Sequence, residues 1–165
     1  MKKILIIGLL LCAVVLMSGC ASKSVLLKIE DDGQWLDSTN AQVDIVKADL
    51  TEIGNHPDSV AVTQQCDKDI QNALAENDKY LVTSKYQSAQ HEWQLALTNY
   101  HDAMQYRIQA LNGDSDNKTL VNNLNTSIDI GSEHMDQFSN EMYGTAASDI
   151  IGGVIDTLTN DNSNN

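Results

Sequence analysis

Four histidines are the residues of this sequence best suited to bind a transition metal or to transfer protons near neutral pH. They are His56, His91, His101 and His134, and no two have the four-residue spacing at which a helical pair shares one zinc ion. His91 and His101 would lie on nearly the same side of one helix, but about 15 Å apart. The motifs HExxH, CxxC and GxSxG do not occur. We therefore predict surface histidines, with no metal, no cofactor and no catalytic residue.

The acidic turn Asp-Ser-Asp-Asn at positions 114–117 has the composition of a calcium-binding loop. Such loops carry glycine at the sixth position and a bidentate glutamate at the twelfth. Counting from Asn112 or Asp114 places Asn123 or Asn125 at the twelfth position, and neither count has glycine at the sixth. We expect a solvated turn between helices and little stabilisation by calcium at sub-millimolar concentration.

The first 19 residues have the three parts of an export signal: Lys2 and Lys3, an apolar run over residues 4–17, and small residues before position 20. The apolar run is shorter than the roughly 20 residues that cross a bilayer as a helix. A cleaved signal is therefore favoured over a permanent membrane span.

The residues Met-Ser-Gly-Cys at positions 17–20 resemble the lipobox of prokaryotic lipoproteins. The resemblance covers the signal and does not extend to the mature domain. It implies that Cys20 is lipidated and becomes the first residue of a protein held on the outer face of a membrane, because two acyl chains anchor stably where one does not. Ala21 after the cysteine implies outer-membrane sorting if the source is Gram-negative.

Removal of the signal would leave eight basic residues against 23 acidic ones, a formal charge of −15. The basic residues are scattered, so nucleic acid and anionic lipid headgroups would be repelled, and we predict no nucleic-acid partner. Cys12 would leave with the signal and Cys20 would carry lipid, which leaves Cys66 alone. No intrachain disulfide is then possible, and the fold must be held by its own core.

Apolar residues recur every three or four positions from Leu36 to Ile53, which predicts an amphipathic helix that ends at Gly54 and Asn55. Pro57 follows, and Asp58 or Ser59 is suited to cap a second helix. The pattern then weakens at Glu-Asn-Asp-Lys, positions 76–79, without glycine or proline. Two alternatives stay open there: a tight turn near Asn77, or one helix of roughly 80 Å running on to Leu111.

The apolar stripe resumes at Val82 and ends before the turn residues Asn112 and Gly113. Within it Trp93, Tyr100 and Met104 have helical spacing and favour core packing over a ligand cage.

A third stripe alternates three- and four-residue steps over three heptads, typical of a coiled-coil seam. It contains Val121, Leu124, Ile128, Gly131, Met135, Phe138 and Met142. Gly131 either leaves a notch or allows a close helix approach. A last short amphipathic stretch spans residues 150–158, weakened by the glycine pair at 152–153.

The sequence thus predicts an all-α, elongated bundle of three or four antiparallel helices. Its expected divisions are a lipoprotein signal peptide at 1–19, a lipidated tether at 20–34, the bundle at 35–159 and a disordered polar tail at 160–165. The leading functional hypothesis is a non-enzymatic, membrane-anchored envelope protein, with a protein partner or a second copy bound through the helical seam. The alternative is an anchored module that binds a ligand or cation beside Gly131 or on the acidic face.

Overall fold

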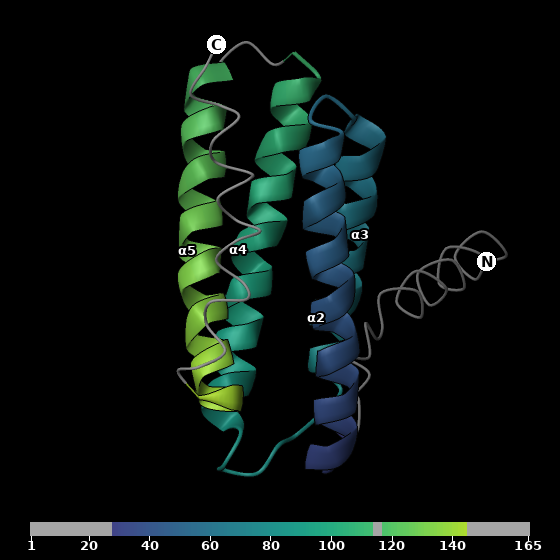
Figure 1. Cartoon of the computed structure of the whole chain (residues 1–165), viewed down its shortest axis with the longest axis vertical. Coiled ribbons are helices and arrows are strands. Elements are labelled where there is room, and N and C mark those ends of the chain that lie inside the picture. The colour runs from purple at the N-terminus through teal and green to yellow at the C-terminus, as the bar shows by residue number, and fades with distance from the viewer. Residues whose placement is uncertain (1–27, 114–116, 145–165) are drawn as a thin grey trace, which may run out of the picture.

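A computed structural model gives the fold, and it describes residues 28–113 and 117–144. These residues form four helices: α2 (Asp32–Asn55), α3 (Val60–Asn77), α4 (Gln87–Leu111) and α5 (Asn117–Tyr143). The helices run side by side in alternating directions (Figure 1). The predicted all-α bundle is therefore confirmed, and it has four helices in the described part of the chain.

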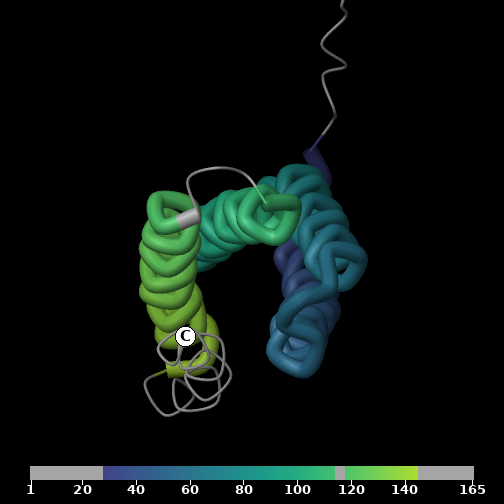
Figure 2. The backbone as a smooth tube through the Cα atoms, turned by 90° about the horizontal axis from the view of Figure 1, so that it is seen from above, coloured from purple at the N-terminus to yellow at the C-terminus, as the bar shows by residue number. Residues whose placement is uncertain are grey.

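Each helix packs on the next one in sequence: α2 on α3, α3 on α4, and α4 on α5. Seen from above, the helices follow one another around an arc with α2 and α5 at its two ends (Figure 2). One hydrogen bond joins those two ends, from the Tyr143 hydroxyl at the end of α5 to the Asn40 side chain on α2. The arrangement is thus built from neighbouring helix pairs, of which α4 and α5 share the largest interface.

Local signals account for most helix boundaries. The Asp31 side chain accepts a hydrogen bond from the Gln34 N–H, so α2 begins at Asp32, within the segment 20–34 that was predicted as a tether. Ser59 caps α3 through the Val62 N–H, as the sequence indicated. Gly113 has φ of 80°, a conformation that favours glycine, and follows directly after α4 and its cap.

The segment after Asn77 resolves the alternative that the sequence left open. α3 ends at Asn77 and α4 begins at Gln87, so the long unbroken helix does not form. Tyr80 and Val82 are buried in the connection, at 7 % and 2 % exposure. The apolar character of Val82 therefore reflects burial of a loop, and the expected restart of the helix at that residue is wrong.

The seam predicted from Val121 to Met142 is confirmed on α5, and α4 of the same chain covers it. Leu124, Ile128, Met135 and Phe138 are buried at 4 % exposure or less. The Phe138 ring lies 5.3 Å from the ring of Trp93 on α4. Because α4 already covers this seam, a partner or second copy would have to bind elsewhere.

Candidate functional site

A buried carboxylate stands between α3 and α4. Asp67 is 7 % exposed, and its Oδ1 lies 2.6 Å from Nδ1 of His101. Its Oδ2 accepts hydrogen bonds from the side-chain amides of Gln71, at 2.8 Å, and Gln105, at 2.9 Å. A carboxylate that orients an imidazole is an arrangement found in general acid–base catalysis. Here both oxygens of the Asp67 carboxylate have hydrogen-bond partners. The cluster therefore also offsets the free-energy cost of burying that carboxylate.

A second pair of the same kind joins α4 to α5. Nδ1 of His134 lies 2.7 Å from Oε2 of Glu92, and the two side chains are 23 % and 14 % exposed. The interface of α4 with α3 and its interface with α5 thus each contain one histidine bound to one carboxylate. The prediction of surface histidines is wrong for His101 and His134, which are half-buried bridges between helices.

The other two histidines lie on the surface, as predicted. His56 is exposed beside Glu52, with 3.1 Å between Nε2 and Oε1, and His91 is exposed on α4. Spacing from the apolar stripes does not separate the two classes. His134 follows Gly131 by three residues, but the exposed His56 likewise follows the buried Ile53 by three.

Cys66, the single cysteine of the described residues, is a poor nucleophile. It is 1 % exposed, and burial raises the pKa of its thiol far above the usual range, with the carboxylates of Asp49, Asp67 and Asp69 adding to the rise. Reactive cysteines need the thiolate and some exposure. Cys66 therefore acts as a small core residue.

The glycine in the α5 seam marks a close helix approach. A Cβ atom at Gly131 would lie 2.8 Å from Cε1 of the Tyr100 ring and 3.3 Å from the Ala96 carbonyl oxygen. Burial raises the pKa of Tyr100 to about 12, and its hydroxyl is buried without a hydrogen-bond partner in the described part of the chain. The space beside Gly131 is thus occupied by Tyr100, and the alternative of a notch for a ligand is not realised.

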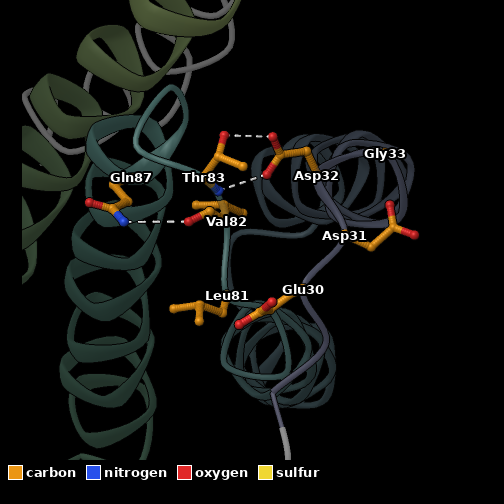
Figure 3. A pocket seen from close by; sticks show the side chains of 8 residues that line it. All are labelled: Glu30, Asp31, Asp32, Gly33, Leu81, Val82, Thr83 and Gln87. Atoms are coloured by element: carbon orange, nitrogen blue, oxygen red, sulfur yellow. Dashed lines mark hydrogen bonds between the residues drawn. The ribbon is translucent and has the colours of Figure 1, made fainter.

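A shallow groove of about 620 Å³ lies where the lead-in segment meets the connection between α3 and α4. Figure 3 shows the side chains that line it: Glu30, Asp31, Asp32, Gly33, Leu81, Val82, Thr83 and Gln87. The Asp32 carboxylate accepts from the backbone N–H and the hydroxyl of Thr83, at 2.8 and 2.7 Å. Asp31 is likewise engaged, as the cap of α2. Two of the three carboxylates of this groove therefore already have partners inside the fold.

Several predicted features lie outside the described residues: the lipidation site Cys20, most of the acidic turn at 114–117, the amphipathic stretch at 150–158 and the polar tail at 160–165. Among the described residues, no cluster of three or more histidine, cysteine or acidic side chains has metal-binding geometry. None of the helices in that same part of the chain is both long and apolar enough to span a bilayer.

Searches for similar proteins found no match among protein-family models, curated proteins or solved structures.

An acidic residue between α2 and α3 leads to a prediction about pH. Burial, and secondarily the nearby charge of Asp69, raises the pKa of Asp49, and its Oδ2 is covered without a hydrogen-bond partner. A raised folded-state pKa means that the native protein binds this proton more tightly than the unfolded chain does. Folding stability is then lost as pH rises through that pKa, because the partly buried carboxyl ionises. At neutral pH this loss of stability is complete. At a pH below the ordinary pKa of the group the loss is absent.

We expect Asp49→Asn to raise the melting temperature at pH 7, and to lose that advantage as the pH falls toward 4. Because the group is partly solvated, the gain should not exceed about 2 to 4 °C, which corresponds to about 1 kcal/mol in a chain of this size. The control is Asp44→Asn on the exposed face of α2, which removes the same charge from the acidic protein. Thermal unfolding followed by circular dichroism at several pH values measures both variants. A lower melting temperature for Asp49→Asn at pH 7 would contradict the prediction.

Proposed function

We propose that this chain is a lipid-anchored extracytoplasmic protein whose helical domain serves interaction or architecture in the cell envelope and carries out no catalysis. One observation carries the proposal. The lipobox-like residues at 17–20 are followed by only the eight residues 21–28 before the chain joins the folded domain through the backbone pairing of Ile29 with Tyr80. A lipid on Cys20 would therefore hold the domain itself close to a membrane, and no long flexible linker intervenes.

The placement of the reactive side chains supports a non-enzymatic role. The carboxylate–histidine pairs Asp67–His101 and Glu92–His134 link neighbouring helices. The thiol of Cys66 is buried and its pKa is raised, which disfavours the nucleophilic form. The two pairs contribute to holding α3, α4 and α5 in register, which is what a structural or interaction domain requires.

The alternative role, an anchored module for a ligand or cation, has less support. Its proposed place beside Gly131 is filled by the Tyr100 ring, and the acidic groove near the lead-in segment has two of its carboxylates bound to Thr83 and Gln34. We therefore keep the interaction protein as the proposed function.

The decisive experiment is Cys20→Ser. We expect the variant to lose incorporation of a labelled fatty acid and to leave the membrane fraction, because the acyl chains are the proposed anchor. Cys66→Ala is the matched control, since it removes the other mature cysteine and should leave labelling and fractionation unchanged. If Cys20→Ser stays in the membrane fraction at the same apparent mass, the lipoprotein assignment is wrong.

A further inference from the structure

The last part of the predicted tether at 20–34 is held to the domain. The Ile29 N–H donates to the Lys79 carbonyl at 2.7 Å, and the Leu81 N–H donates to the Ile29 carbonyl at 2.9 Å. Two further hydrogen bonds join Thr83 to the Asp32 carboxylate (Figure 3). The position at which the chain leaves the fold toward Cys20 is thereby fixed.

That position defines one end of the bundle, which we call the anchor end. α2 and α4 begin there, and α3 and α5 finish there, as their alternating directions require (Figure 1). Residues 21–28 lie between the proposed lipid on Cys20 and the paired Ile29, and eight residues span at most about 28 Å when fully extended. The anchor end is therefore the part of the domain that a lipid on Cys20 keeps nearest to the bilayer.

The anchor end carries exposed apolar side chains. The described residues contain five exposed large hydrophobic side chains, and two of them, Ile29 and Leu81, lie at this end. Ile29 and Leu81 are 40 % and 46 % exposed and are joined directly by a backbone hydrogen bond. Single exposed apolar residues are common on soluble proteins, whereas this adjoining pair makes a small apolar surface at the point where the chain leads toward Cys20.

Charge at the anchor end does not by itself favour an anionic surface. Lys28, Lys79 and Lys85 are exposed there, beside a larger number of carboxylates: Glu30, Asp31, Asp32, Glu76 and Asp78. Lys79 forms an ion pair with Glu76. Contact with a membrane would thus depend on the anchor and on the aliphatic side chains, and would not need anionic lipid.

We propose that the anchor end rests on the headgroup layer of the membrane that holds Cys20, with Ile29 and Leu81 at the interface. This inference depends on the proposed lipidation. In the proposed orientation the helix axes point away from the bilayer, because the lead-in segment is fixed at one end of the bundle. The opposite end, which contains the turn at 56–59 and the Asn112–Gly113 corner, then stands about 37 Å further out, the length of the 25-residue helix α4.

The test uses the full lipidated protein in liposomes of zwitterionic lipid. Leu81→Cys carries an environment-sensitive fluorophore, and Ile45→Cys is the matched control, because Ile45 is a 41 % exposed aliphatic residue in the middle of α2. Cys66 is 1 % exposed, and its burial protects it from labelling in the folded protein. The measurement is quenching of the fluorophore by lipids that carry a spin label near the headgroup.

We expect severalfold stronger quenching at position 81 than at position 45, with the same result for Ile29→Cys. Equal quenching at positions 81 and 45 would overturn the inference, as would quenching at position 81 that appears only with anionic lipid. Flotation of the same liposomes separates this failure from failure of the proposed function. A protein that does not float with the lipid lacks its anchor, whereas one that floats without selective quenching is anchored in another orientation.

Discussion

We expect Phe138→Ala to lower the free energy of unfolding by about 3 to 5 kcal/mol, the usual cost of truncating a buried phenylalanine. Phe138 is fully buried in the α5 seam. Its ring lies 5.3 Å from the ring of Trp93, so the variant also loses an aromatic pair worth about 0.5 to 1.5 kcal/mol. The α4–α5 interface is the largest in the described fold, and its neighbouring seam residues are close-packed. A void left there has little freedom to collapse.

Urea unfolding of the soluble fragment that begins at Ala21, followed by far-ultraviolet circular dichroism, measures this change. The matched control is Gln137→Ala, one residue earlier on the exposed face of α5. A substitution at such a surface position usually changes stability by no more than about 0.5 kcal/mol. Similar losses for the two variants would show that α5 does not pack on α4 through the Phe138 face.

The α5 seam shows what the sequence could predict about the fold. A helix that packs on one neighbour buries one stripe, so the three- and four-residue spacing from Val121 to Met142 specifies the buried face directly. The spacing does not say what covers that face. Ala96 and Tyr100, which meet α5 at Gly131, come from a helix more than 30 residues earlier. The seam was therefore predictable, and its occupation by α4 was not.

The connection between α3 and α4 was harder to predict. Periodicity alone does not distinguish an apolar residue buried in a loop from one on a helical face, and Val82 is of the first kind. Ile29 pairs with Tyr80 across some 50 residues, and such non-local pairing leaves no mark on the local pattern.

The two histidine–carboxylate pairs were missed for a similar reason. Asp67 and His101 are 34 residues apart, and Glu92 and His134 are 42 apart. Their meeting depends on the register of neighbouring helices, which composition and spacing do not set. The site proposed from the sequence, Cys20, depends on a local signal and lies outside the described residues, so it stays a prediction.

Trp35 carries the other large expected effect, because it joins three helices at the anchor end. It is fully buried in the first turns of α2, and its indole N–H donates to the Asn77 side chain at the end of α3, at 2.9 Å. Its ring centroid lies 5.7 Å from that of Tyr86, the residue before α4. The Asn77 amide is itself part of a network with Gln90 on α4.

We expect Trp35→Ala to cost about 3 to 5 kcal/mol, with the Asn77 oxygen left unpaired in addition. Trp35→Phe separates the two contributions, because it keeps most of the apolar ring and removes the donor. It should cost about 1 to 3 kcal/mol, the penalty for a buried acceptor without a partner. We expect Asn77→Leu to cost less stability when it is added to Trp35→Phe than when it is made in the wild-type protein, since residues that share a hydrogen bond are coupled. Urea unfolding of the wild type, Trp35→Phe, Asn77→Leu and the double variant measures the coupling. Strictly additive losses of unfolding free energy would show that the indole does not hold the end of α3 against α2.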